Sequence, residues 1–291
     1  MFHKRQMDYE GFHYIFMALK DQTIIRRASK ISIFDVREIW RYRDLLVMLT
    51  DREIRLRYKQ TGLGVIWTIL QPLVPSIIFA IVFGMFAKLP SDGNVYLLFV
   101  FTGTMIWNLF SQSITRAGNS LVGNANLISK IYFPRILIPL SSICAVVFDF
   151  IITIIVLIAF MLIYKTPPTW GLVFAPFFLL LAVVTAIGIS LWLSALNVKY
   201  RDFMYAMPFI IQVWLYATPV VYASSIVPHK FRWIYSVNPA VGFVEGFRWA
   251  VLGKGTVSMT MIAVSSSMAI ITFFTGLAYF KSTERSFADI V

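Results

Sequence analysis

The chain has 291 residues, of which 58% are hydrophobic and only 14% are charged, and its mean hydropathy is +0.74. Soluble domains contain about 25% charged residues, so the composition excludes an ordinary soluble enzyme, and the high hydrophobicity excludes intrinsic disorder. The net charge of +12 comes from basic residues beside apolar runs, which does not favour nucleic-acid binding. The sequence therefore predicts an all-α membrane protein.

Six long runs with almost no charged residues predict six transmembrane helices. Each run has 23 residues or more, and about 20 apolar residues are enough for a helix to cross a bilayer. The runs are too continuous for barrel strands, and backbone groups in lipid are satisfied within a helix. The predicted spans are residues 65–87, 95–117, 137–163, 172–196, 204–222 and 258–280.

The region before the first span is more polar. Residues 1–34 are expected to form an N-terminal cytoplasmic extension. Residues 35–64 are predicted to contain one or two amphipathic helices at the membrane interface, with a soluble helical cap as the alternative. The apolar face of this region consists of Ile39, Tyr42, Leu46, Leu49 and Leu56.

Local polar patterns add detail to the amphipathic region. The segment TDRE at residues 50–53 matches a capping box, which predicts that a helix starts again there. Asp51 with Arg55, and Glu53 with Arg57, place an acid four residues before a base, the favourable order on a helix.

Two connectors complete the predicted membrane domain over residues 65–282. The inner loop, residues 121–136, mixes polar and apolar residues and predicts a short helix parallel to the membrane. The outer segment, residues 223–257, is long and apolar but is interrupted by prolines and glycines. It predicts a re-entrant hairpin between helices five and six, with an ordinary folded loop as the alternative. Residues 283–291 form the predicted cytoplasmic tail.

The distribution of basic residues predicts the orientation. Segments on one side of the six spans hold 20 of the 26 Lys and Arg residues. Cytoplasmic segments are the ones enriched in these residues. Both termini are therefore expected in the cytoplasm.

Catalytic and metal-binding patterns are missing from the sequence. His3, His13 and His229 are far apart, and the lone Cys144 permits neither an intrachain disulfide nor a zinc cluster. A P-loop is also missing, because GKGT at residues 253–256 lacks the required spacing. The sequence thus predicts a protein that is not an enzyme and that holds no metal or cofactor of its own.

Asp149 is the only ionisable residue deep in a predicted span. Such a group is costly in a bilayer, so three interpretations stay open: a helix contact, a substrate pathway or a proton relay. Aromatic faces can also stack on sugar rings, although interfacial belts explain many of the aromatic residues. The candidates to line a channel are Trp67, Trp107, Trp192 and Trp214.

Four segments together resemble a known family. They are YKQTGLGVIW at residues 58–67, KIYFPR at 130–135, LNVKYRD at 196–202 and VNP at 237–239. In this order and topology they resemble the membrane subunits of polysaccharide-exporting ABC transporters, the ABC-2 permeases of O-antigen, capsule and teichoic-acid export. The resemblance extends over about residues 35–282.

The resemblance implies a channel formed between two copies of this chain in the bacterial cytoplasmic (inner) membrane. Two separate ATP-binding subunits would dock on the cytoplasmic side and bind ATP and Mg, which agrees with the missing P-loop. The implied substrate is a polysaccharide linked to polyprenyl pyrophosphate, and membrane lipid would surround the channel.

The resemblance also implies roles for particular residues. The coupling contacts with the ATPase would be made by Asn126, Lys130, Tyr132, Arg135, Lys199, Tyr200, Arg201 and Asp202. The outer gate would contain Asn238, Pro239, Glu245 and Arg248. A basic set next to the first span would hold the lipid pyrophosphate, or alternatively would form a basic face against anionic lipid. This set is Arg52, Arg55, Arg57 and Lys59.

Three other functions are weighed against this one. An ABC exporter of a drug or a small lipid would share the fold and differ in cargo. An ion-coupled carrier would need ionisable groups near the membrane centre, where only Asp149 lies. A membrane enzyme would need an acidic or histidine cluster at one face, and the sequence has none.

Overall fold

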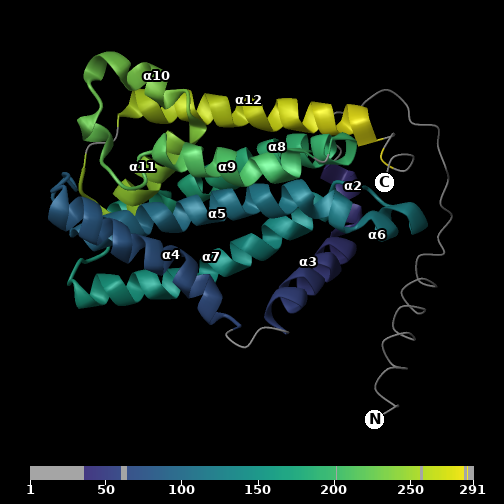
Figure 1. Cartoon of the computed structure of the whole chain (residues 1–291), viewed down its shortest axis with the longest axis horizontal. Coiled ribbons are helices and arrows are strands. Elements are labelled where there is room, and N and C mark those ends of the chain that lie inside the picture. Colours follow the sequence, from purple (N-terminus) through teal and green to yellow (C-terminus); the bar gives the residue numbers. More distant parts are fainter. Residues whose placement is uncertain (1–35, 60–63, 201, 256–257, 285–286, 288–291) are drawn as a thin grey trace, which may run out of the picture. The chain divides into compact units, whose positions relative to one another are not determined.

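The computed structural model describes residues 36–59, 64–200, 202–255, 258–284 and 287, and all regular structure among them is helical (Figure 1). The predicted extension over residues 1–34 and most of the predicted tail lie outside these residues. The predicted fold class is confirmed in its general form, an all-helical protein with several helices of membrane-spanning length.

Five helical stretches are long and apolar enough to cross a membrane, and they coincide with five of the six predicted spans. The first is α4, Ile66–Phe79, which continues as the π-helix η1, Ala80–Phe86. The others are α5 (Tyr96–Gly123), α7 (Leu137–Ile163), the 3₁₀ turn η2 (Trp170–Phe174) with α8 (Ala175–Lys199), and α12 (Met259–Thr283).

The predicted fifth span differs. Residues 204–222 were expected to be one helix, but α9 extends over Asp202–Tyr216 and has 15 residues. At 1.5 Å per residue it is about 22 Å long, shorter than a hydrocarbon core of about 30 Å. The chain continues as turns over residues 217–222.

Short helices make up the two connectors. The inner loop contains α6, Ala125–Lys130, as the sequence predicts. The outer segment contains the 3₁₀ turns η3 (Ser224–Ile226) and η4 (His229–Phe231), then α10 (Arg232–Ser236) and α11 (Pro239–Leu252).

The amphipathic region forms α2, Val36–Arg41, and α3, Arg43–Tyr58. The predicted capping box is wrong, because α3 is unbroken through residues 50–53. The Thr50 hydroxyl instead donates to the Leu46 carbonyl at 2.8 Å, a bond that a threonine makes inside a continuous helix. The helices separate at Tyr42.

Helices α5, α8 and α12 run in the same direction, and α7 runs against them. Asn197 near the end of α8 donates to the Gly118 carbonyl near the end of α5 at 2.8 Å. Leu191 in the second half of α8 lies in one apolar cluster with Leu277 and Phe280 near the end of α12. A Cβ at Gly276 of α12 would overlap Gly188 of α8. The rings of Phe101 and Phe160, from the start of α5 and the end of α7, lie 5.1 Å apart.

These directions define two ends of the bundle. The α6 end carries α6 and the last turns of α5 and α8. The α11 end carries α11, because Arg248 of α11 bonds to the Phe99 carbonyl in the first turns of α5. Nearly all of α11 is buried.

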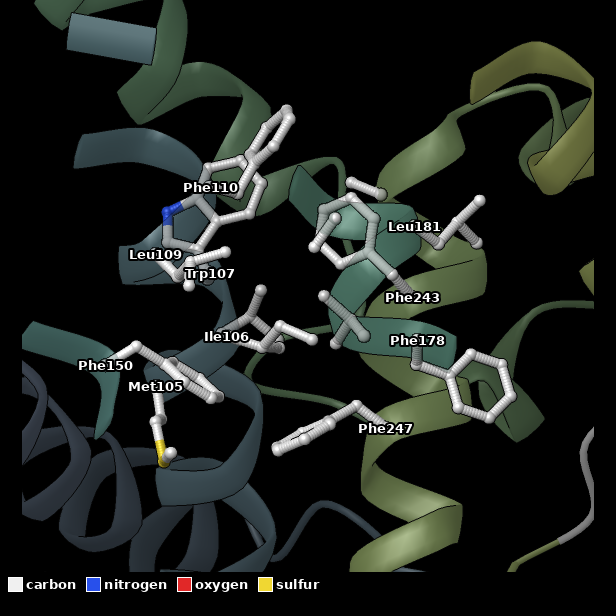
Figure 2. Packing of buried hydrophobic residues seen from close by; sticks show 14 of the residues in the cluster. Met105, Ile106, Trp107, Leu109, Phe110, Phe150, Phe178, Leu181, Phe243 and Phe247 are labelled. Atoms are coloured by element: carbon white, nitrogen blue, oxygen red, sulfur yellow. The ribbon is translucent and has the colours of Figure 1, made fainter. Parts of the chain in front are cut away.

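Two apolar clusters hold the bundle together. The larger cluster joins α5, α7, α8 and α11, and Figure 2 shows Ile106, Phe150, Phe178 and Phe243 among its side chains. The smaller cluster lies at the α6 end, where the described members Leu121, Ile128, Leu137, Leu191 and Phe280 meet.

The smaller cluster also anchors the amphipathic region. Leu49 is buried in it, and Ile39, Tyr42 and Leu46 pack against it, so these four residues form the predicted apolar face. Leu56 lies on the same side of α3, two turns beyond Leu49, but it is 59% exposed and takes no part in this packing.

Candidate functional site

The buried acid of the third span has partners on the amphipathic helix. Asp149 of α7 forms an ion pair with the Arg57 guanidinium and accepts a hydrogen bond from the Tyr58 hydroxyl. The Tyr58 oxygen also lies 3.0 Å from the Thr68 hydroxyl of α4. Of the three interpretations of Asp149, the structure shows the helix contact, which joins α3, α4 and α7.

A small polar cavity adjoins this contact. Its volume is about 30 Å³, enough for a water molecule or two. The polar side chains that line it come from α4, α5 and α7 and are Thr68, Gln71, Asn108, Gln112, Asp149 and Thr153.

Side chains of both charges lie around the cavity. Arg116 of α5 donates to the Gln112 side chain at 3.1 Å and lies close enough to Arg57 for the two charges to interact. Burial lowers the pKa of Arg57, and the nearby Tyr58 and Glu53 oppose that effect. Two guanidinium groups therefore lie near a cavity that Asp149 lines, and Glu53 adds a second negative charge to their surroundings.

The four predicted entrance cations do not point the same way. Arg52 donates to the Asn124 side chain at 2.7 Å, next to α6. Arg55 forms the predicted pair with Asp51 at 2.6 Å, with both side chains exposed. Lys59 is exposed as well, whereas the side chains of Arg57 and Asp149 are only 17% and 16% exposed.

The polar side of α6 faces outward. Asn126 and Lys130 are exposed, and Tyr132, which follows the helix, is 91% exposed. Ile128 and Phe133 point into the smaller apolar cluster and hold the segment in place.

Arg135, predicted as a fourth coupling residue of this loop, is engaged inside the protein. Its backbone N–H donates to the Glu284 carboxylate at 3.2 Å, and its guanidinium donates to the Glu284 carbonyl. Arg135 also lies 6.0 Å from the Phe287 ring. It therefore connects α7 to the end of α12.

The second predicted coupling segment lies at the same end of the bundle as α6, because α5 and α8 are parallel. Lys199, Tyr200 and Asp202 are exposed, and the Lys199 ammonium lies 5.1 Å from the centre of the Tyr200 ring. Arg201 lies outside the described residues.

The four tryptophans proposed to line a channel separate into two pairs. Trp67 and Trp192 are 52% and 38% exposed. Trp107 is 4% exposed inside the larger cluster, and Trp214 packs on Phe110 and donates to the Asn238 side chain at 2.9 Å. Trp107 and Trp214 are thus occupied by packing within this chain.

The four predicted outer-gate residues lie at the α11 end. Asn238 caps α11 by accepting from the Ala240 N–H at 3.0 Å, and Pro239 is the first helical residue. Arg248 pairs with Glu245 at 2.9 Å.

The Arg248 guanidinium is fully engaged. It donates to the Phe99, Pro219 and Val220 carbonyls at 2.8–3.2 Å, and it lies 3.7 Å from the centre of the Phe99 ring. Glu245 accepts from the Ser224 N–H at 3.3 Å. Arg248 thereby ties α11 to the start of α5 and to the turns after α9.

The sequence interpretation assigned no site to the residues around the polar cavity, although Asn108 and Gln112 are polar residues inside a predicted span. Asn108, Gln112 and Arg116 recur every four residues and so share one face of α5. This four-residue spacing could have indicated, from the sequence alone, a polar face on the second span. Tyr58 and Thr68 offered no comparable signal.

Comparison with known proteins defines the class of this fold. Residues 44–252, more than half of the chain, match the family model described as ABC-2 type transporter. The chain belongs to this family, as the four sequence segments predicted, and the family implies association with the ATP-binding subunits of an ABC transporter.

Individual relatives cover most of this chain. An O-antigen export system permease protein RfbA of Klebsiella pneumoniae is 32% identical, over 85% of this chain and 95% of its own length. The RfbA protein of Myxococcus xanthus is 24% identical over 88% and 98%. The polysialic acid transport protein KpsM of Escherichia coli is 23% identical over 81% and 92%.

These findings agree with a non-catalytic subunit, because the similar RfbA proteins are named as permeases. Together with the five apolar helices they identify a multi-pass membrane protein.

Proposed function

We propose that this chain is the membrane-spanning subunit of an ATP-driven exporter of a polysaccharide linked to polyprenyl pyrophosphate. The polysaccharide would be an O-antigen, or alternatively a capsule or teichoic-acid polymer. The observation that carries this proposal is the similarity over nearly the full chain to permeases named for O-antigen export. The similarity to a polysialic acid transport protein supports the wider class of polysaccharide cargo.

In the proposed topology the chain crosses the inner membrane six times and both termini are cytoplasmic. Because α8 and α12 run in the same direction, the chain between them has to return from the α6 end to the α11 end. Helix α9, with the turns after it, makes this return, although it is short for a span. The α6 end is then cytoplasmic, and α10 and α11 form a re-entrant outer hairpin.

The proposed assembly contains two copies of this chain and two ATP-binding subunits, which bind ATP and Mg and carry out hydrolysis. They would dock on the α6 end. The exposed side chains of Asn126, Lys130 and Tyr132 and those of Lys199 and Tyr200 support this placement, because all five are accessible to a partner. ATP-driven movement of α6 would shift the bundle as a rigid body.

The proposed entrance for the lipid pyrophosphate lies along α3. Arg52, Arg55 and Lys59 are exposed there, and Arg57 lies beside the polar cavity. Cations next to the membrane attract phosphate groups, and guanidinium binds them with paired hydrogen bonds. An ion-coupled carrier is less well supported, because the carboxylate that it would need already forms an ion pair with Arg57.

The test replaces Arg52, Arg55, Arg57 and Lys59 together by Gln in the complete transporter. Export of the polysaccharide to the cell surface is expected to be lost, because the four cations at the C-terminal half of α3 that would hold the pyrophosphate are gone. Surface polysaccharide is measured by immunoblot, and membrane insertion by the amount of full-length protein in the membrane fraction.

The matched control removes the same number of charges at the opposite end of the bundle. It replaces Lys88, Lys165, Lys230 and Lys254 by Gln, and export is expected to continue. Unchanged export in the α3 variant would contradict the role assigned to these cations.

A further inference from the structure

The entrance cation that reaches deepest into the protein is already held by an anion of the protein itself. Arg57 is paired with Asp149, which comes from a different helix and lies 92 positions later in the sequence. We infer that Asp149 is a specificity-determining residue: it occupies Arg57 so that a ligand with a single negative charge does not bind there, and a pyrophosphate displaces it. This inference rests on the function proposed above.

The competition follows from charge and geometry. A phospholipid phosphodiester carries one negative charge, as the Asp149 carboxylate does, and it gains little by replacing a preformed pair. A pyrophosphate carries at least two charges and more acceptor oxygens, and guanidinium groups bind such groups through several charge-assisted hydrogen bonds. Arg116, close to Arg57, offers the second charge a second guanidinium.

Specificity of this kind is needed at a lateral entrance. The first anions that α3 meets in a membrane are phospholipid head groups, which far outnumber any lipid-linked polysaccharide. A site discriminates by the difference between two affinities, and an internal competitor lowers the affinity of the weaker ligand most. Without Asp149, Arg57 and Arg116 would form an unselective phosphate site.

The displaced carboxylate has other partners within reach. The Tyr58 hydroxyl already donates to Asp149. Asn108 lines the same cavity, and its side-chain Nδ2 is buried with no hydrogen-bond partner among the described residues. Because the cavity also has room for water, Asp149 remains solvated by polar groups after Arg57 leaves it.

Release of Arg57 also changes a contact with the first span. Tyr58 connects Asp149 to Thr68 in the first turn of α4. When the carboxylate moves, the hydroxyl that joins α3 to α4 loses its present arrangement. Binding of a pyrophosphate at Arg57 therefore changes the contact between α3 and α4, the helix that begins beside the entrance.

The test uses the complete transporter, this chain with its ATPase partner, in lipid nanodiscs. One series contains phosphatidylcholine with increasing phosphatidylglycerol, and a second contains phosphatidylcholine with a low fraction of undecaprenyl pyrophosphate. Retained lipid is identified by native mass spectrometry, and ATP hydrolysis is followed in parallel. The variants are Asp149→Asn and the control Asp44→Asn, which removes the same charge from an exposed pair with Arg43 on α3.

In the native protein and in the Asp44→Asn control, undecaprenyl pyrophosphate is expected to bind and phosphatidylglycerol is not. Asp149→Asn is expected to retain phosphatidylglycerol, and its preference for pyrophosphate should fall roughly tenfold, within the usual range of coupling between two ligands. An Asp149→Asn protein with the native preference would overturn the inference and leave the proposed function in place. A native protein that does not respond to undecaprenyl pyrophosphate would overturn both.

A second variant tests the same inference if the Asp149→Asn protein fails to assemble with its ATPase partner. Asn108→Leu removes the Nδ2 donor that receives the displaced carboxylate, and it changes no charge. Its affinity for undecaprenyl pyrophosphate is expected to fall roughly fivefold, with no binding of phosphatidylglycerol. An unchanged affinity for undecaprenyl pyrophosphate would overturn the inference.

Discussion

Two ion pairs, one at the α11 end and one midway along α7, are partly or fully buried, and they are built differently. Glu245 and Arg248 belong to one helix, three residues apart, and their side chains are only 10% and 3% exposed. Arg57 and Asp149 belong to different helices and lie beside a polar cavity. The first pair fixes the fold at the α11 end, whereas the second can separate without unfolding a helix.

The surroundings of the pairs support this difference. The Arg248 guanidinium donates to three backbone carbonyls as well as to Glu245, so its loss would leave these buried acceptors without their donor. Helix α11 also packs closely, because a Cβ at Gly242 or Gly246 would overlap a neighbouring side chain. Along α3, in contrast, Arg52, Arg55 and Lys59 are exposed.

The largest expected effect on stability is that of Arg248→Met. The change leaves Glu245 buried without its charge partner and three carbonyls without their donor, which typically costs about 3–5 kcal/mol. Thermal unfolding of the purified protein in detergent measures it, with the exposed Lys230→Met as control. A midpoint equal to that of the control would contradict the anchoring role of Arg248.

A smaller effect is expected for Gly246→Ala. The new Cβ would overlap the Phe178 ring of α8, and overpacking of this kind usually costs about 1–3 kcal/mol. The control is Gly123→Ala at the α6 end, where nothing lies within 4 Å of the added carbon. Equal unfolding midpoints for the two variants would show that the α11 end is not packed as tightly as described.

The smallest effect is expected for Asp51→Asn. The pair with Arg55 is exposed, at 53% and 70% for the two side chains, and exposed pairs contribute less than about 1 kcal/mol. The unfolding midpoint should stay within error of the native value at moderate salt. A loss as large as that for Gly246→Ala would mean that this pair stabilises α3 far more than its exposure predicts.

The sequence predicted most of the helices because their signal is local. Runs with almost no charge predicted α4, α7, α8 and α12 to within a few residues, whereas α5 continues six residues past its predicted end at residue 117. Helix α9 ended earlier than expected because hydropathy continues through residues 217–222, where the backbone already turns. The capping box failed because its residues also fit the interior of a helix.

The site was predictable only in part, because its contacts are long-range. Tyr58 and Asp149 are separated by 91 residues, and nothing in either local sequence indicates the partner. Composition also does not tell which face of a helix is buried, so Trp107 and Trp67 looked alike in the sequence although one is 4% and the other 52% exposed.

The central claim is that this chain works with ATP-binding subunits to export a lipid-pyrophosphate-linked polysaccharide. Native mass spectrometry of the protein, extracted gently from cells that express its neighbouring genes, tests this directly. The account predicts two copies of the chain with two copies of a P-loop ATPase, together with a bound polyprenyl pyrophosphate that carries sugars. A chain that appears without an ATPase in several mild detergents and retains only phospholipid would contradict it.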